Sequence, residues 1–221
     1  PYIQTMNFVL MNFPWTHGYS ENFLDQKRAN QLGSDFPKWD SQIWDTHGKV
    51  FKSEYGHKKE LTDKSAMPQS IVNFIEDLEN KTFIDRVSAA TGIENLFIDH
   101  GMYGGGLNIY PPGSHLTTHI DFNYNNDLQA YRSVNLLYYM NDDWSPNSGG
   151  CFELFDTDLN KCKTVKPELN TCIFFATNDG TYHGVSATQN DFYRKSISIW
   201  YYTKEPTENL SKEPHKTLWV K

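Results

Sequence analysis

Cysteine is scarce in this chain of 221 residues: only Cys151, Cys162 and Cys172 occur, and no two of them form a C-x-x-C pair. Cysteine-type zinc sites use closely spaced pairs, so the pattern argues against such a site. An odd number of cysteines is also unlike a disulfide framework. We therefore expect three free thiols and a protein of the reducing cytoplasm.

Long hydrophobic runs are absent as well. No stretch approaches the ~20 apolar residues that cross a bilayer, so we expect no membrane partner. Residues 1–13 contain a short apolar run without the basic flank or cleavage pattern of a secretory leader, and this run predicts an edge strand. Basic residues are outnumbered 20 to 27 by acidic ones, which gives a formal net charge of -7. Because this charge repels a phosphate backbone, nucleic acid is not an expected partner.

What is present is typical of one globular domain. Apolar residues make up 38% and aromatic residues 15% of the chain, which argues against disorder. Repeats and long linkers are missing, so residues 1–221 are predicted to form a single domain. We expect loop and helical support in 1–95, a strand-rich core in 96–203, and in 204–221 a polar tail with a small apolar anchor.

Two helices are predicted ahead of the strand-rich part. Apolar residues recur at helical spacing within 71–78 and again within 83–90. Pro68 suits a first helical turn, and Gly92 suits the C-terminal stop. Residues 14–60 show no sustained periodicity and are expected to form loops with short elements.

From residue 96 onward, eight short segments rich in β-branched and aromatic residues alternate with turns. Strands of this length and spacing are typical of a closed barrel or a jelly roll. The predicted fold class is therefore mostly β with flanking helices.

The sharpest motif is His119-Ile120-Asp121. Residues i and i+2 of a strand project to one face, so the imidazole and the carboxylate converge. His183, 62 residues beyond Asp121, offers a third ligand. Two histidines and one carboxylate on one face of an octahedron are the pattern of non-haem Fe(II) oxygenases. Each histidine taken singly is also consistent with a hydrogen-bonded strand or core residue, so the metal prediction depends on its surroundings.

Arg194 follows His183 after eleven residues, and Ser196 shares its strand face. A guanidinium binds a carboxylate through two parallel hydrogen bonds, and a nearby hydroxyl can add a third. An arginine that points into a barrel needs an anion, because an unpaired buried charge is costly. The alternative is a surface arginine at a strand start.

Polar side chains also occur on the neighbouring predicted strands. Tyr110 precedes the PPG turn, and Asn135 and Tyr139 share one face of the next long strand. Polar groups inside a barrel need partners, and a dicarboxylate would provide them. Tyrosines packed with their hydroxyls at a rim are an equally good explanation.

Together these residues resemble the 2-oxoglutarate-dependent dioxygenases of the prolyl 4-hydroxylase type. The similar stretch covers nearly half of the chain, from about Tyr103 to Thr203. It contains, in the family's order and spacing, YGGGLNIYPPGSHLTTHIDFNYN, YRSVNLLYYMNDDW, SGGCFELFD, TCIFFAT, YHGVSA and RKSISIWYYT. The C-terminal HKTLW is similar to the tail of bacterial members, and the first ninety residues match only loosely. The resemblance implies a double-stranded β-helix core of the jelly-roll, cupin-like type.

The resemblance also implies roles for single residues. The implied iron ligands, which carry catalysis, are His119, Asp121 and His183. The residues implied at the co-substrate are Arg194 for the distal carboxylate of 2-oxoglutarate, with Ser196, Tyr110, Tyr139 and, less directly, Asn135. Arg132 and Trp200 match positions that approach the substrate in protein prolyl hydroxylases, although a strand-entry arginine and a core tryptophan would explain them equally well.

The implied reaction is the hydroxylation of an unactivated C–H bond with Fe(II), 2-oxoglutarate and O2. Succinate and CO2 are the co-products, and ascorbate would play a supporting role. The expected substrate is a prolyl residue of a peptide or protein. Asp121 favours hydroxylation, because related halogenases replace this carboxylate with a small residue.

Four other interpretations compete. Hydroxylation of a free amino acid or another small metabolite uses the same site. A nucleobase demethylase would carry a second arginine six residues after Arg194, where Trp200 stands instead. A non-oxygenase cupin-type metal protein would use more histidines; His115 is the candidate, and we expect it at the barrel rim. A non-catalytic interaction protein would need neither the triad nor Arg194.

Overall fold

The computed structural model describes residues 8–220. The strands are β1 Val9–Met11, β2 His17–Ser20, β3 Lys49–Ser53, β4 Gly56–Leu61, β5 Phe97–Ile98, β6 Gly106–Tyr110, β7 Leu116–Ile120, β8 Tyr124–Asn125, β9 Ala130–Tyr139, β10 Phe152–Phe155, β11 Lys161–Val165, β12 Cys172–Ala176, β13 His183–Val185, β14 Arg194–Thr203 and β15 Leu218–Trp219. The helices are α1 Gln26–Asp35, α2 Ile43–Thr46, α3 Gln69–Glu79 and α4 Lys81–Thr91, with a 3-10 turn at Lys64–Ala66.

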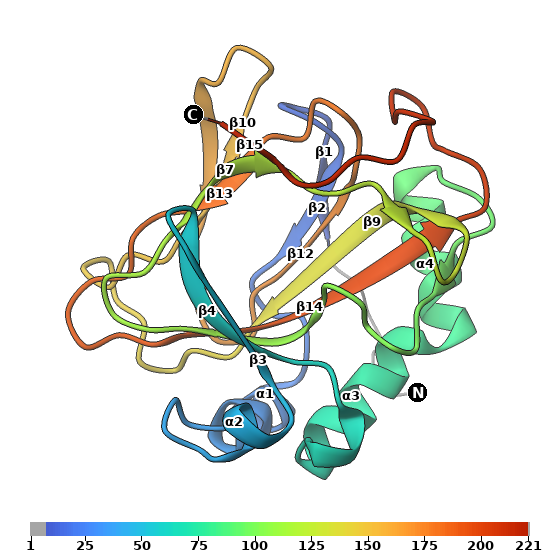
Figure 1. Ribbon diagram of the computed structural model, residues 1–221. Coiled ribbons are helices and arrows are strands. Elements are labelled where there is room, and N and C mark those ends of the chain that lie inside the picture. The colour runs from blue at the N-terminus through green and yellow to red at the C-terminus, as the bar shows by residue number, and fades with distance from the viewer. Residues whose placement is uncertain (1–7, 221) are drawn as a thin grey trace.

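The strands form one continuous antiparallel sheet that curls on itself (Figure 1). Hydrogen bonds join them in the order β1-β2-β12-β9-β14-β6-β4-β7-β13-β10-β11, with β15 beside β7, β3 beside β4, β5 beside β14 and β8 beside β9. The long strands β9 and β14 lie at the centre of one layer. The strands β7, β13, β10 and β11 form the opposite layer.

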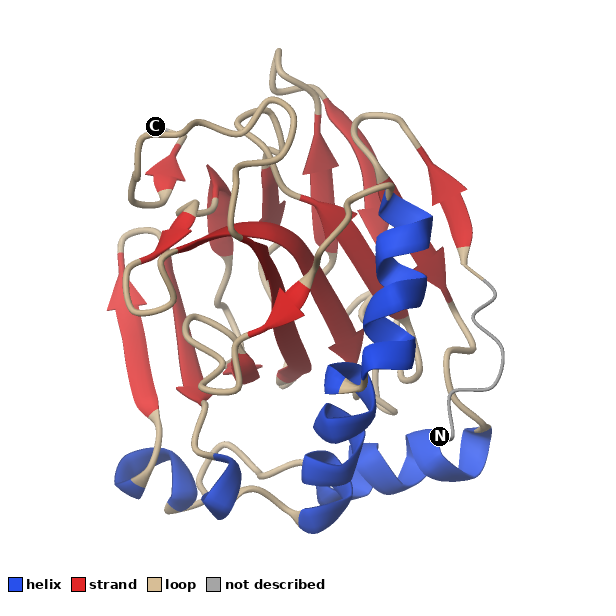
Figure 2. Cartoon of the chain, turned by 90° about the vertical axis from the view of Figure 1, so that its right-hand side faces the viewer, coloured by secondary structure: helices blue, strands red, loops and turns tan. Residues whose placement is uncertain are grey.

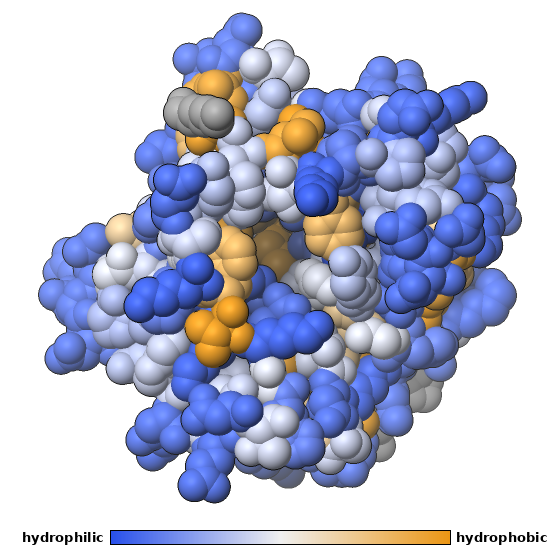
Figure 3. Space-filling model, viewed as in Figure 1, coloured by the Kyte–Doolittle hydropathy of each residue, from blue (hydrophilic) through white to orange (hydrophobic). Residues whose placement is uncertain are grey.

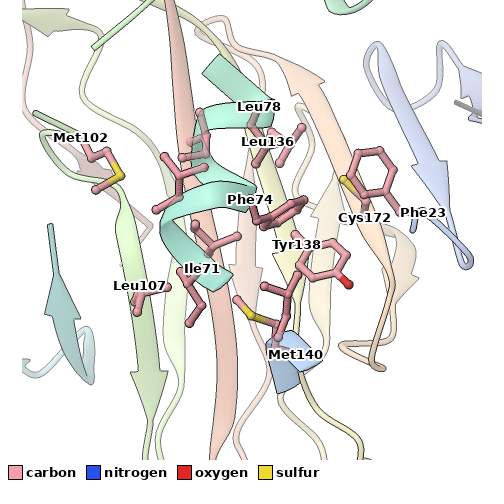
Figure 4. Packing of buried hydrophobic residues seen from close by; sticks show 14 of the residues in the cluster. Phe23, Ile71, Phe74, Leu78, Met102, Leu107, Leu136, Tyr138, Met140 and Cys172 are labelled. Carbon is pink, nitrogen blue, oxygen red and sulfur yellow. The ribbon is translucent and has the colours of Figure 1, made fainter. Parts of the chain in front are cut away.

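Helices cover the outer face of the layer that contains β9 and β14 (Figure 2). The alternation along β9 explains this, because Leu136 and Tyr138 point to the helices whereas Asn135 and Tyr139 point to the barrel interior. Phe74 of α3 packs against Tyr138 with ring centroids 4.8 Å apart (Figure 4). Truncating a buried phenylalanine of this kind to alanine typically costs about 3–5 kcal/mol.

Strand β4 closes the barrel between the two layers. It pairs with β6 through Lys59 and Ile109, and with β7 through Gly56 and Leu116. The contact with β7 requires glycine at position 56, because a Cβ there would lie 2.4 Å from the carbonyl oxygen of His115. A segment that precedes the strand-rich part of the chain thus becomes a wall of the barrel interior.

The mostly β fold with flanking helices is confirmed. The two predicted helices are α3 and α4; Pro68 is the N-cap of α3, and Gly92 caps α4 with a φ of 72°. The eight predicted strands are β5, β6, β7, β9, β10, β12, β13 and β14. The predicted edge strand is β1 for residues 9–11, and the part before residue 8 lies outside the described residues.

The sequence interpretation underestimated two regions. Residues 14–60 contain the ten-residue helix α1 and the hairpin β3–β4, in addition to loops. The tail is also more than a surface segment, because Leu218 and Trp219 add a strand to β7. The sheet therefore includes strands from both sides of 96–203, while the division of the chain into parts stays a prediction.

Candidate active site

Two neighbouring strands bring the predicted metal ligands together. His119 on β7 pairs directly with His183 on β13, and Asp121 follows the end of β7. The Nε2 atom of His183 lies 3.1 Å from Asp121 Oδ2, and the Nε2 atom of His119 lies 3.5 Å from Asp121 Oδ1. One ligand atom from each of the three residues lies within 4.8 Å of the others. Among the described residues, this is the group that could hold a metal ion, and His115 is outside it.

Backbone carbonyls fix the tautomer of both imidazoles. His119 Nδ1 is 2.8 Å from the carbonyl oxygen of Thr117, and His183 Nδ1 is 2.8 Å from that of Thr181. A carbonyl oxygen can only accept, so each Nδ1 carries a proton, and Nε2 is the ligand atom of the neutral imidazole. Both Nε2 atoms face the Asp121 carboxylate, an orientation that outer hydrogen bonds commonly fix in metal sites.

The charge states also suit metal binding, which needs neutral imidazoles and an ionised carboxylate. Burial lowers the pKa of His119, and the nearby His183 lowers it further. Burial alone would raise the pKa of Asp121, but the adjacent His183 and His119 outweigh it and hold the pKa well below its usual range. The donor set of two imidazole nitrogens and one carboxylate therefore fits a divalent iron ion.

Arg194 is 2% exposed and lines a cavity that His119, Asp121 and His183 also line. Its Nε donates to the carbonyl oxygen of Gly150 at 2.8 Å, its Nη2 to the Tyr139 hydroxyl at 3.2 Å, and its Nη1 to Ser196 Oγ at 3.4 Å. No carboxylate of residues 8–220 forms an ion pair with it. The alternative of a surface arginine is therefore wrong, and two of the five guanidinium N–H groups are available for an anion.

The other predicted co-substrate residues surround Arg194. The rings of Tyr110 and Tyr139 both lie 4.9 Å from its guanidinium carbon. Burial raises the pKa of Tyr139 to about 12, with Arg194 acting against the rise, so the hydroxyl stays protonated. Asn135 donates to Ser198 Oγ at 3.0 Å on the cavity wall.

The triad and Arg194 share one cavity, whose remaining wall is partly apolar. Its apolar lining comes from Leu116, Leu137, Phe152 and Val185. Figure 3 shows the surface hollowed between β4, β7 and β9, with apolar side chains inside the hollow. Such a wall limits the access of water to the polar groups at either end.

The two predicted substrate residues occupy different places. Trp200 lines the cavity, and its Nε1 donates to the carbonyl oxygen of Gly104 at 3.1 Å. Arg132 is 1% exposed and is not part of the cavity wall. Its guanidinium lies between two aromatic rings. The guanidinium carbon is 3.4 Å from the ring centroid of Phe122 and 3.9 Å from that of Trp200. Arg132 thus supports the wall from behind, and direct contact with a substrate stays a prediction.

Two residues near the site were missed by the sequence interpretation. Lys58 of β4 lines the cavity. The ring of Trp219 packs on the His119 ring at 4.7 Å and stacks on Tyr55 of the β3–β4 turn at 4.6 Å. Lys58 lies in the polar segment GHKKEL, which lacks the alternation of apolar and polar residues that would have predicted a strand. Trp219 was recognised only as an apolar anchor, because its partner lies a hundred residues away in sequence.

Residues 105–202 match the family model of the 2OG-Fe(II) oxygenase superfamily. The matched segment contains the triad, Arg194 and both tyrosines. The match covers less than half of the 221 residues, and this part of the chain resembles the 2OG-Fe(II) oxygenase superfamily. The match supports a 2-oxoglutarate-dependent dioxygenase, and the fold is a prolyl 4-hydroxylase-like double-stranded β-helix.

Solved structures support the fold of this oxygenase. A prolyl-4-hydroxylase of Pseudomonas putida is 17% identical over 84% of this chain and 91% of its own, with a TM-score of 0.61. A prolyl hydroxylase of Trichoplax adhaerens, in complex with a hypoxia inducible factor peptide fragment, is 17% identical over 84% and 83%, with a TM-score of 0.57. The non-haem alpha-ketoglutarate-dependent epimerase SnoN of nogalamycin biosynthesis is 14% identical over 84% and 76%, with a TM-score of 0.56. None of the curated proteins matches the chain in sequence.

The match to the family model favours one of the competing interpretations at the coarse level. It implies Fe(II), 2-oxoglutarate and O2, and the residues present fit the metal. The oxygenase interpretation therefore prevails over the cupin-type metal protein and the interaction protein. The three cysteines are free, as expected. None of the described helices is long and apolar enough to cross a membrane.

Proposed function

We propose that this oxygenase hydroxylates an unactivated C–H bond of a prolyl residue in a peptide or protein. The observation that supports it most is the shared cavity, which is lined both by the His-Asp-His group and by an arginine that forms no ion pair with a carboxylate of residues 8–220. When bound, iron and 2-oxoglutarate supply the oxidising chemistry that couples O2 and decarboxylation to hydroxylation, with succinate and CO2 as co-products.

The chain's own residues hold and orient these groups. His119, Asp121 and His183 would hold the iron through two imidazole nitrogens and one carboxylate oxygen. Arg194 would bind the distal carboxylate of the co-substrate through its two available N–H groups. The hydroxyls of Tyr139 and Ser196 keep its guanidinium in place.

Tyr110 and Asn135 would complete the co-substrate end of the cavity. Trp200 would line the approach of the substrate, and Arg132, packed on its ring, would fix its orientation. Asp121 favours hydroxylation as the outcome because it occupies a coordination position. Ascorbate would support the reaction by keeping the iron reduced. A cytoplasmic location and the single-domain organisation belong to the same proposal.

The prolyl substrate is favoured by two structural relatives that are prolyl hydroxylases, one of them with a peptide bound. Hydroxylation of a free amino acid or other small metabolite is the second candidate. The fold also occurs in an epimerase, so the substrate has to be determined by experiment.

The test is an assay of purified protein with Fe(II), 2-oxoglutarate, O2 and ascorbate. We expect succinate to form, and a proline-containing peptide to gain the mass of one oxygen atom. His183→Ala should abolish both, whereas His115→Ala, outside the triad, should retain both. Mass gain only on small metabolites would overturn the prolyl proposal, and the absence of succinate with every substrate would overturn the oxygenase site.

A further inference from the structure

A buried cation that the proposed reaction does not use faces the cavity. Lys58 lies on β4, whose register with β6 pairs Lys59 with Ile109 and so places Lys58 beside Tyr110. On the other side of β6, Tyr110 pairs with Arg194. Lys58 and Arg194 therefore flank Tyr110 from opposite sides, both directed into the same cavity.

The ammonium of Lys58 is held by two acceptors. Its Nζ donates to Asn108 Oδ1 at 2.6 Å and lies 3.1 Å from Glu60 Oε2. An ammonium has three N–H groups, so one remains for the cavity. Burial lowers the pKa of Lys58, but Tyr110, Glu60 and Asp121 together raise it above the usual value, so the cation persists.

The charges of the co-substrate are already accounted for elsewhere. One carboxylate of 2-oxoglutarate would meet the metal, and the other would meet Arg194. Glu60 lies at the edge of an adjoining groove with Tyr103 and Phe122, and it is not part of the cavity wall itself. The free N–H of Lys58 thus remains the cationic donor next to the space that a substrate would occupy.

We propose that Lys58 binds a carboxylate of the primary substrate, and so selects substrates that carry an anion close to the carbon that is hydroxylated. This inference rests on the proposed function. The carboxylate would lie near the reacting carbon because Lys58 and Asp121 line one cavity. It could be the α-carboxylate of a free or C-terminal amino acid, or the side chain of an acidic residue next to the target.

The ion pair between Lys58 and Glu60 allows a structural role of Lys58 to be distinguished from a role in substrate binding. If Lys58 and Glu60 only stabilise the hairpin, then Lys58→Met and Glu60→Gln both break the same contact and change substrate binding in the same direction. If Lys58 anchors a substrate carboxylate, Glu60 competes with that carboxylate for the ammonium. Lys58→Met then weakens binding, while Glu60→Gln preserves or strengthens it.

The experiment measures binding by calorimetry to the Fe(II)-loaded protein with 2-oxoglutarate in the absence of O2, so that no turnover is needed. The first probe pair is N-acetylproline and its primary amide. The second is N-acetyl-prolyl-glutamate α-amide and its glutamine analogue, which separates a main-chain from a side-chain carboxylate. Free proline and leucine with their amides extend the test to small substrates.

We expect the wild-type protein to bind the carboxylate member of at least one pair about tenfold or more tightly than its neutral partner. Lys58→Met should remove this preference without changing the affinity for 2-oxoglutarate, and Glu60→Gln should retain it. No preference in any pair, or a preference that both variants lose, would overturn the inference. So would weaker 2-oxoglutarate binding in Lys58→Met with the preference intact, because Lys58 would then serve the co-substrate.

The two proposals can fail separately. If succinate forms in the turnover assay but no carboxylate preference exists, only the role of Lys58 is wrong. If the protein neither binds nor decarboxylates 2-oxoglutarate, the oxygenase site itself is wrong, whatever Lys58 binds.

Discussion

Replacing Arg194 by methionine removes a cation from the cavity wall while keeping a long apolar side chain. The guanidinium donates three hydrogen bonds to Gly150, Tyr139 and Ser196, which leaves two N–H groups for a carboxylate. The space that these two groups face is the co-substrate end of the site. The variant should therefore affect 2-oxoglutarate more than any other ligand.

The size of the effect follows from the two lost bonds. A hydrogen bond with a charged partner contributes about 1.5–3 kcal/mol, so two contribute ~3–6 kcal/mol. Water that enters the vacated space offsets part of this loss. We expect a net loss of about 3 kcal/mol, which is a rise of roughly 10²-fold in the Michaelis constant for 2-oxoglutarate.

Initial-rate kinetics at varied 2-oxoglutarate provide the assay, with metal affinity measured separately by titration. Arg194→Lys keeps the charge but lacks the planar fork, and should fall between the wild type and Arg194→Met. Lys195→Met is the matched control, because Lys195 points away from the cavity and pairs with Asp142 at 3.5 Å. A loss of metal binding with an unchanged Michaelis constant for 2-oxoglutarate would refute the assigned role.

Three further changes test other parts of the structure. Asp121→Ala should weaken metal binding and abolish hydroxylation, as seen by metal titration and product mass; unchanged product would remove Asp121 from the site. Trp219→Ala deletes ring contacts with His119 and Tyr55. Because each aromatic contact contributes about 0.5–1.5 kcal/mol, the free energy of unfolding measured by denaturant titration should fall by ~1–3 kcal/mol, and Trp219→Phe should lower it less. Burial lowers the pKa of His17 below its unfolded value of 6.5. As the pH falls below 6.5, the unfolded state gains a proton before the folded state does, so the folded protein should lose stability. His17→Gln should flatten this pH dependence in thermal unfolding.

Strand periodicity made the core of the site predictable. The spacing of two along β14 places Arg194, Ser196 and Trp200 on the cavity face, where all three line the wall. The H-x-D spacing likewise brings His119 and Asp121 together. These relations depend only on local backbone geometry, which a sequence pattern records directly.

The contacts that complete the site depend on pairing between distant segments, and no local pattern records them. Strand β4 carries the polar residues Lys58 and Glu60, so it lacks the apolar alternation that marks a strand. Helix α1 is mostly polar and buries few apolar side chains, among them Leu32, so it has fewer of the apolar residues that mark α3 and α4. The carbonyl groups that orient the two histidines come from the backbone two residues earlier, and their direction depends on the folded backbone.

The charged groups of the cavity come from different strands, which separates the residues assigned to the reaction from the residue proposed to select the substrate. The metal-binding group comes from β7 and β13 of one layer, and the co-substrate arginine comes from β14 of the other. Lys58 comes from β4, the strand that joins the two layers. A change in the β3–β4 hairpin can therefore alter which substrate is accepted without moving the triad or Arg194. If Lys58→Met changes substrate preference while decarboxylation in the absence of substrate continues at the wild-type rate, this division of roles holds; a parallel loss of both would show that β4 belongs to the reaction centre itself.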